Sequence, residues 1–176
     1  MFNKKWQQKK HDKIINWQAN NHNLCEITKC LLANRNIVEQ NDIELFLQPS
    51  LNQIKNPYLF ADLEKASLRI MQAIKNKEVI GIFGDYDVDG VCSTALLVDF
   101  LRSINANVCA TLPNRLTEGY GLSAKGIDRL AKQKASLIIT TDCGSQAFDE
   151  VEYARSLGIE VIVIDHHNVL DSLQKA

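Results

Sequence analysis

From residue 77 onward, short apolar runs rich in β-branched residues alternate with longer segments of helical character, and this alternation constrains the fold most strongly. The expected strands are 79–83, 107–112, 136–141 and 159–164, and the expected helices are 91–103, 123–134 and 146–157. Ser123 is suited to cap the second helix, and Gly158 to end the third. Strands and helices that alternate in this way form a mainly parallel sheet with helices on both faces. The sequence therefore predicts an α/β domain over residues 77–176.

Residues 1–76 lack this alternation, and their apolar residues recur at helical spacing, punctuated by Pro49 and Pro57. The residues expected to line buried helix faces are Ile37, Leu45, Leu59, Leu63, Leu68, Ile70, Met71 and Ile74. We therefore expect a small helical N-terminal segment before the α/β domain, without visible chemistry of its own.

Composition excludes several classes of protein. No apolar run reaches the roughly 18 residues of a membrane span, and the first residues lack the apolar core of a signal peptide, so we expect a cytoplasmic protein. The 5 cysteines are odd in number and irregularly spaced, which argues against a disulfide framework. A net charge of -1 carries no overall nucleic-acid signature. Lysines do cluster near the start, a pattern more typical of a solvated helix face than of a phosphate-binding arm. These are Lys4, Lys5, Lys9, Lys10 and Lys13.

Acidic residues and histidines follow three of the expected strands. They are Asp85, Asp87 and Asp89 after the first, Asp142 after the third, and Asp165, His166 and His167 after the fourth. Parallel α/β sheets place their sites beyond the carboxyl ends of their strands. We therefore expect these side chains to converge at one edge of the sheet.

The triple-aspartate loop favours a metal site. In an extended segment, alternate residues point the same way, so Asp85, Asp87 and Asp89 are expected roughly 6–7 Å apart in succession. Such carboxylates repel one another unless they are solvated, protonated or neutralised by a cation. The oxygen-rich set prefers Mg²⁺ or Mn²⁺, and the histidines favour Mn²⁺. A calcium loop is the competitor, but it needs a preceding helix and a Glu at its twelfth position, where this chain has Leu96.

Two further segments carry candidate residues. Adjacent histidines on a regular strand cannot both face one metal, so one of His166 and His167 is expected to ligate while the other contacts a phosphate oxygen or orients its neighbour. The alternative is that the histidines are ordinary solvated residues of a loop. In residues 112–123, Arg115 is suited to bidentate phosphate contact, and two glycines flank Tyr120. Taken alone, that loop is equally typical of an ordinary turn.

The segments resemble, in order and spacing, the four motifs of the DHH phosphoesterases. Within that superfamily, the residues of the first two motifs look specifically like those of the RecJ family. The four segments are Gly84-Asp85-Tyr86-Asp87-Val88-Asp89-Gly90, Pro113-Asn114-Arg115 through Gly119-Tyr120-Gly121, Thr141-Asp142-Cys143-Gly144, and Asp165-His166-His167. The lead-in from Phe46 to Pro57 is also similar, so the resemblance covers roughly residue 35 to the end. It implies a DHH domain over residues 77–176 after the helical segment.

The resemblance also implies a function: a two-metal phosphodiesterase, using Mn²⁺ or Mg²⁺, that degrades single-stranded DNA from the 5′ end in recombination and repair. It implies Asp87, Asp89, Asp142 and His166 as ligands, with Asp85 and Asp165 as supporting or partial ligands. It implies that His167 contacts the phosphate or the second metal, and that Arg115 binds a neighbouring phosphate. The implied partners are single-stranded DNA, a single-stranded-DNA-binding protein and a RecQ-type helicase. The alternatives are a phosphodiesterase of short oligonucleotides or cyclic dinucleotides, and an inactive remnant.

One departure from the family pattern concerns length. Family members carry a further metal-ligand aspartate beyond the fourth motif, then a DHHA1 domain and an OB-fold, whereas this sequence stops at Ala176. The resemblance thus implies an incomplete DHH domain. For the chain by itself we expect weak metal binding, little hydrolysis and a tendency to associate through an exposed sheet edge.

Overall fold

The computed structural model describes residues 24–167, in two units that are considered separately: Met1–Leu59 and Phe60–Ala176. The lysine cluster near the start lies outside the described residues. The boundary expected after residue 76 falls inside the second unit, after its first helix. None of the described helices is both long and apolar enough to cross a membrane.

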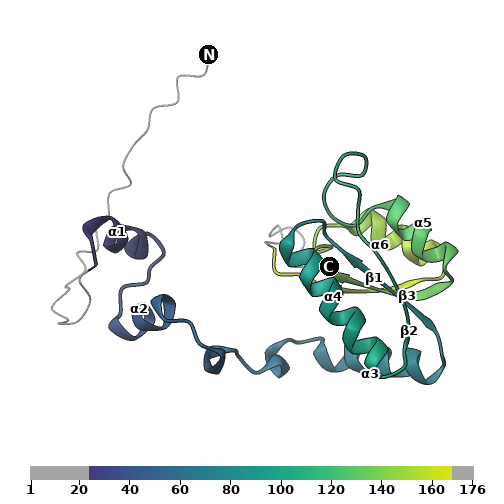
Figure 1. Ribbon diagram of the computed structural model, residues 1–176, viewed down its shortest axis with the longest axis horizontal. Coiled ribbons are helices and arrows are strands. Elements are labelled where there is room, and N and C mark those ends of the chain that lie inside the picture. Colours follow the sequence, from purple (N-terminus) through teal and green to yellow (C-terminus); the bar gives the residue numbers. More distant parts are fainter. Residues whose placement is uncertain (1–23, 168–176) are drawn as a thin grey trace, which may run out of the picture. The chain divides into compact units, whose positions relative to one another are not determined.

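The second unit contains a parallel sheet that alternates with helices (Figure 1). Its elements are α3 (Leu63–Lys75), β1 (Val79–Gly84), α4 (Val88–Ser103), β2 (Asn107–Thr111), α5 (Ala124–Lys132), β3 (Ala135–Thr141), α6 (Phe148–Ser156) and β4 (Glu160–Ile164). The strand order is β2-β1-β3-β4, and every neighbouring pair is parallel. The predicted fold class is confirmed.

Two apolar layers hold helices against opposite faces of the sheet. One contains Ile80, Ile82, Leu137 and Ile139 of the strands, with Ala73 of α3 and Val98 and Leu101 of α4. The other contains Phe83 and Ile138, with Ile127 and Leu130 of α5 and Ala154 of α6. Helices α3 and α4 therefore cover one face, and α5 and α6 cover the other. Since α4 leaves β1 on one face while α6 leaves β3 on the other, the chain diverges between these neighbouring strands, which is where sites form in such sheets.

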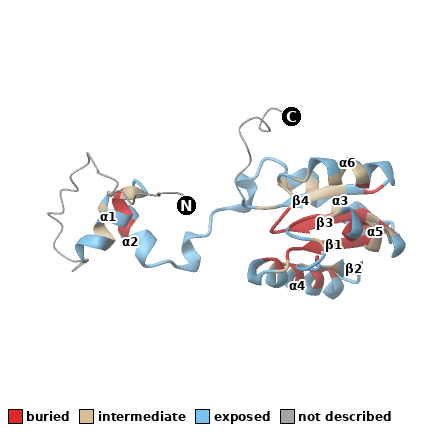
Figure 2. Cartoon of the chain, turned by 90° about the horizontal axis from the view of Figure 1, so that it is seen from above, coloured by how far each residue is buried: buried red, intermediate tan, exposed pale blue. Residues whose placement is uncertain are grey.

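The two central strands are the most buried part of the molecule, drawn in red in Figure 2. They are covered on both faces, so their sequences are nearly continuous apolar runs. The edge strands β2 and β4 are more exposed. This burial fixes the carboxyl ends of β1 and β3 side by side, with Phe83 opposite Thr140 and Gly84 opposite Thr141.

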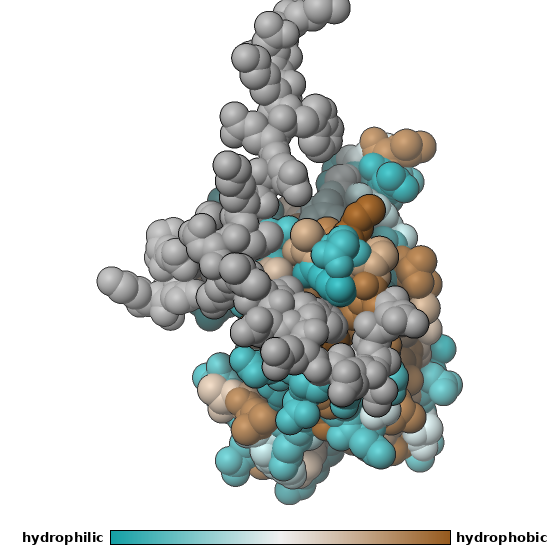
Figure 3. Space-filling view, turned by 90° about the vertical axis from the view of Figure 1, so that its left-hand side faces the viewer, coloured by the Kyte–Doolittle hydropathy of each residue, from teal (hydrophilic) through white to brown (hydrophobic). Residues whose placement is uncertain are grey.

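The first unit contains α1 (Glu26–Asn34), α2 (Gln40–Leu47) and two short 3-10 turns, Leu51–Gln53 and Pro57–Leu59. Its helical character is as predicted, and Leu32 and Ile43 are its largest buried residues. The predicted buried faces are partly wrong, because Leu45 and Leu59 are exposed. In α3, Leu68 and Met71 are likewise exposed, whereas Ile70, Ala73 and Ile74 pack on the sheet. Exposed apolar side chains lie among hydrophilic ones on the visible face in Figure 3.

Candidate metal centre

The loop after β1 turns directly into a helix. Asp87 is the N-cap of α4, and its Oδ1 accepts a hydrogen bond of 3.0 Å from the Gly90 backbone N–H. Gly90 permits this entry, since a Cβ there would lie 2.4 Å from the Asp85 carbonyl oxygen. The expectation that Asp85, Asp87 and Asp89 alternate along an extended segment is therefore wrong. Aspartate is among the best N-cap residues, and α4 consequently begins at Val88 rather than at Val91.

Asp85 lies beneath this turn and is completely buried. Its Oδ1 is 3.4 Å from the backbone N–H of Gly121, a long hydrogen bond, and its Oδ2 has no hydrogen-bond partner within the described part of the chain. An unpaired buried carboxylate oxygen carries a large desolvation cost. A cation at the site would remove that cost.

Asp142 follows β3 and meets the loop after β1. Its φ of 63° places it in the left-handed region, and its N–H donates to the carbonyl of Ile164, which ties this turn to β4. The side chain is nearly buried, and its Oδ1 lies 3.0 Å from Nε2 of His166. Burial, followed by the charge of Asp87 and a hydrogen bond with it, raises the pKa of Asp142. Carboxylates from two strand ends thus meet closely enough to disfavour a second negative charge.

Asp165 follows β4, and both of its carboxylate oxygens accept hydrogen bonds from the chain. Its Oδ2 accepts a hydrogen bond from the Ser145 N–H at 2.9 Å, and its Oδ1 accepts from the backbone N–H groups of His166 and His167. The same Oδ1 lies 2.7 Å from Nδ1 of His167. Burial opposes ionisation, but these hydrogen bonds outweigh it and hold the pKa of Asp165 well below its usual range. The pairing in turn raises the pKa of His167.

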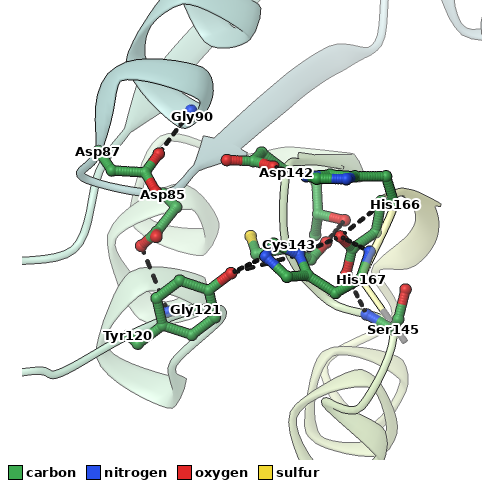
Figure 4. A network of polar contacts seen from close by, with 12 residues as sticks. Asp85, Asp87, Gly90, Tyr120, Gly121, Asp142, Cys143, Ser145, His166 and His167 are labelled. Carbon is green, nitrogen blue, oxygen red and sulfur yellow. Dashed lines mark hydrogen bonds and ion pairs between the residues drawn. The ribbon is translucent and has the colours of Figure 1, made fainter. Parts of the chain in front are cut away.

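The pKa values of two neighbouring side chains are raised, in part by the negative charges of this cluster. Burial, then the charges of Asp85, Asp142 and Asp165, raises the pKa of Tyr120 to about 12. Burial and the same three carboxylates raise the pKa of Cys143 to about 12. Figure 4 shows both residues within the network. The part of these shifts that comes from the three carboxylates reflects a negative potential, which favours a cation nearby.

The donor set fits a divalent metal ion. Ligand atoms of Asp142, His166 and His167 lie within 4.8 Å of one another. Asp87 is close enough to Asp142 to perturb it, and Asp85 adds a buried oxygen without a partner among the described residues. Two carboxylate-rich strand ends combined with imidazoles suit Mg²⁺ or Mn²⁺. Both oxygens of Asp165 already accept hydrogen bonds, so this side chain is suited to hold the ring of His167 in its orientation.

The remaining predicted residues lie at the margin of this cluster. Asp89 is exposed in the first turn of α4, where its charge is favourable for the helix. Arg115 is exposed, with its guanidinium carbon 5.4 Å from the centre of the Tyr86 ring. A strand precedes the triple-aspartate loop, so the structural context of a helix–loop–helix calcium site is absent there.

Sequence reasoning missed the role of Tyr120. Its hydroxyl oxygen lies 2.9 Å from Nε2 of His167 (Figure 4). Its ring contacts those of Tyr86 and His167 edge-on. The flanking glycines indicated unusual backbone geometry, and both have positive φ, 79° at Gly119 and 81° at Gly121. Nothing local indicated its partner, which is 47 positions away.

Comparison with known proteins adds independent information. The family model described as "DHH family, N-terminal domain" matches residues 79–176. The single-stranded-DNA-specific exonuclease RecJ of Bacillus subtilis is 37% identical over 137 residues, covering 78% of this chain and 17% of that protein. The Escherichia coli protein of the same name is 44% identical over 115 residues, covering 65% of this chain and 20% of that protein. The chain thus spans about a fifth of the length of these curated relatives.

Solved structures with the same name are also similar. A crystal structure of exonuclease RecJ bound to manganese matches with a TM-score of 0.57 and 35% identity, over 62% of this chain and 28% of that chain. RecJ from Thermus thermophilus in complex with Mn²⁺ matches with a TM-score of 0.55 and 27% identity, over 80% of this chain and 19% of that chain.

Proposed function

The chain belongs to the DHH family, and we propose that it is a metal-dependent phosphodiesterase that degrades single-stranded DNA from the 5′ end, in recombination and repair. The observation that carries the proposal is the meeting of Asp142 with Asp87, His166 and His167 at the carboxyl edge of the sheet. The named function of the relatives in Bacillus subtilis and Escherichia coli supports single-stranded DNA as substrate.

We assign the divalent ions to the acidic cluster. Asp87, Asp142 and His166 are the principal proposed ligands, with Asp85 contributing from beneath and Asp89 from the first turn of α4. The manganese complexes of the related structures support Mn²⁺ as the ion, with Mg²⁺ as the other candidate. When bound, two such ions neutralise charge on the scissile phosphate and lower the pKa of an attacking water.

The chain's own residues have distinct tasks in this proposal. Asp165 fixes the ring of His167 through Nδ1, so that His167 presents one defined nitrogen to the metal or phosphate. Arg115 supplies a cation for a neighbouring phosphate of the strand. Tyr86, against which Arg115 lies, keeps that guanidinium near the site.

The alternative substrates are short oligonucleotides and cyclic dinucleotides, and the remaining alternative is a domain without activity. The relatives named as single-stranded-DNA-specific exonucleases favour the first assignment. We further propose a cytoplasmic location, with a single-stranded-DNA-binding protein and a RecQ-type helicase as partners.

The proposal is tested with the purified chain in two steps. Isothermal titration with Mn²⁺ should show binding that Asp87→Asn weakens strongly. Mononucleotide release, expected to be slow for this chain, should require Mn²⁺ and proceed faster from a 5′-labelled single strand than from a dinucleotide. A chain that binds no Mn²⁺ refutes the metal centre, and a preference for dinucleotides refutes the substrate class.

A further inference from the structure

Arg129, on α5, fastens the loop between β2 and α5 at three places. Its Nε donates a hydrogen bond of 2.8 Å to Oγ1 of Thr111, where β2 ends, and its Nη2 donates one of 3.2 Å to the carbonyl of Leu112. Nη1 and Nη2 also donate to the two carboxylate oxygens of Glu118, at 2.8 and 2.9 Å. One side chain of the helix thus binds both the start of this loop and its middle.

Glu118 is fully engaged by this contact. Its side chain is 7% exposed, and its Oε2 also accepts a hydrogen bond of 3.2 Å from the hydroxyl of Ser123, the N-cap of α5. The hydrogen bonds from Arg129 lower the pKa of Glu118, so its charge is favoured by the fold. A guanidinium that donates two parallel hydrogen bonds to a buried carboxylate fixes the geometry between them, even where desolvation leaves little net stability. The pair therefore specifies one conformation of the loop.

The turn that ends at Glu118 carries Arg115. Within this turn, the Leu116 N–H donates to Oδ1 of Asn114 at 2.9 Å, and the Glu118 N–H donates to the Asn114 carbonyl at 2.8 Å. Arg115 is exposed, and its guanidinium carbon lies 5.4 Å from the centre of the Tyr86 ring. The backbone of Arg115 is thus tied to Glu118, and through Glu118 to α5.

We propose that Arg129 and Glu118 are positioning residues that set the affinity for the DNA strand, because they hold Arg115 where it contacts a phosphate. The proposal rests on the phosphate contact of Arg115 proposed above, and in it neither Arg129 nor Glu118 touches the strand. Ordering a long side chain and its loop at the moment of binding weakens a contact. The ion pair orders this loop before the strand binds. The principal proposed metal ligands lie in the loops after β1, β3 and β4, so Mn²⁺ affinity should not depend on the pair.

Two substitutions separate this role from a direct effect of charge. Arg129→Lys keeps the positive charge but cannot donate the two parallel hydrogen bonds, and it should weaken strand binding by about threefold to tenfold. Glu118→Gln removes a negative charge from a loop that binds phosphate, so electrostatics alone predicts tighter binding. Positioning predicts weaker binding by a similar factor, since an amide offers one acceptor oxygen to a guanidinium that pairs with two.

The test measures binding of the full chain, with Mn²⁺ present, by fluorescence anisotropy. The probe is a 5′-phosphorylated oligothymidylate that carries fluorescein at its 3′ end and has phosphorothioate linkages, which resist hydrolysis. Arg115→Ala should weaken binding, and Arg129→Lys should then have no further effect, because it acts through Arg115. The matched control is Glu78→Gln, since Glu78 pairs with Arg69 at 2.8 Å at the other end of the sheet. It should leave strand binding within about twofold.

Each outcome of this test has a distinct meaning. If Arg129→Lys weakens binding as much in the Arg115→Ala background as in the wild type, the inference is overturned, because the effect does not pass through Arg115. Tighter binding in Glu118→Gln overturns it as well, and both results leave the proposed function standing. A wild-type chain that binds Mn²⁺ and not the strand overturns the proposed substrate class together with the inference.

A measurement without DNA tests the positioning itself. In nitrogen-15 spectra of the arginine side chains, the Tyr86 ring should displace the Nε–H resonance of Arg115 from that of a solvated arginine, and Tyr86→Leu should abolish the displacement. Arg129→Lys should also abolish it, whereas Glu78→Gln should not. The backbone amide signals of the same samples show whether each variant is folded. An Arg115 resonance that stays displaced in folded Arg129→Lys overturns the inference irrespective of any binding result.

Discussion

Charged side chains gather at both ends of the sheet. At one end they are paired with opposite charges, and at the other they are mostly of one sign. At the amino end, Arg69 of α3 pairs with Glu78 at 2.8 Å and with Glu160, beside β1 and β4. Ser136 and Asn76 donate further hydrogen bonds to Glu78. At the carboxyl end, the carboxylates outnumber the cations, and Asp85 retains an oxygen without a partner among the described residues.

The pKa shifts show the same contrast. Hydrogen bonds from Arg69 and Ser136 lower the pKa of Glu78, so its charge is favoured by the fold. Burial and the charge of Asp87 raise the pKa of Asp142, so its charge is disfavoured. The amino end thus pairs its charges within the chain, although Nη1 of Arg69 has no hydrogen-bond partner among the described residues. The carboxyl end has an excess of carboxylates and is arranged for a cation that the described part of the chain does not contain. This difference separates a structural cluster from a functional one more clearly than residue types do.

The largest effect is expected at the carboxyl end when metal is present. Asp142→Asn should weaken Mn²⁺ binding by more than roughly 100-fold, since losing even an outer-shell partner costs about 10- to 100-fold. Glu78→Gln, an equivalent substitution at the amino end, should leave the affinity within about twofold. Isothermal titration calorimetry measures both. Equal losses in the two variants would mean that the contrast between the two ends is not functional.

The reverse experiment acts on the amino end. Arg69→Met leaves Glu78 without its cation, and the free energy of unfolding should fall by about 2 kcal/mol, as for hydrogen bonds to charged groups. Urea denaturation without metal provides the measurement. The control is Arg155→Met, which removes an exposed pair with Glu152 within α6 and should change stability by less than about 0.5 kcal/mol. Similar values for the two variants would show that Arg69 contributes no more than a surface pair.

These two ends differ in how well the sequence predicts them. The strands and helices after residue 77 were predictable, because β1 and β3 are covered on both faces and retain nearly continuous apolar runs. The cap by Ser123 is confirmed, with its hydroxyl accepting from the Gly126 N–H. The pairing of Arg69 with Glu160 was not predictable, because it joins residues 91 positions apart.

At the site, the convergence of Asp87, Asp142, Asp165 and His166 at one edge followed from the parallel order of the strands. The conformations of the loops could not be derived from strand order, because helix capping and tertiary contacts determine them. Asp87 could continue a strand or cap a helix, and the packing of Gly90 against Asp85 favours the cap. The engagement of Tyr120 with His167 depends on a loop whose path is fixed by Glu118 and Arg129.

A smaller effect is expected from Asp142→Asn when metal is absent. A carboxylate whose folded-state pKa is raised destabilises the fold at neutral pH and does so less as pH falls through that pKa. The neutral amide should therefore raise the free energy of unfolding by about 1 kcal/mol, the usual size of a single-residue effect. Urea denaturation in the presence of a chelator measures this change. A destabilised variant would show that the ion pair with His166 outweighs the repulsion from Asp87.

The smallest effect concerns the pair of Asp165 and His167, the part of the carboxyl end that most resembles the amino end. The lowered pKa of Asp165 gives stability that is present above 3.8 and is lost as pH falls through the folded value. The raised pKa of His167 gives stability that is fully present below 6.5 and is lost as pH rises through its folded value. Both contributions are complete between those limits.

The difference in stability between wild type and His167→Gln should consequently be larger at about pH 5.5 than at about pH 8, in metal-free urea denaturation. In an Asp165→Asn background the pH dependence of this difference should shrink, because the hydrogen bond and charge of Asp165 are the largest causes that raise the pKa of His167, while the smaller contributions of Asp142 and Asp87 remain. A pH dependence as large as in the wild-type background would assign the charge on His167 to Asp142 and Asp87. The pair would then belong to the unsatisfied cluster, and the carboxyl end would contain no internally neutralised part among the described residues.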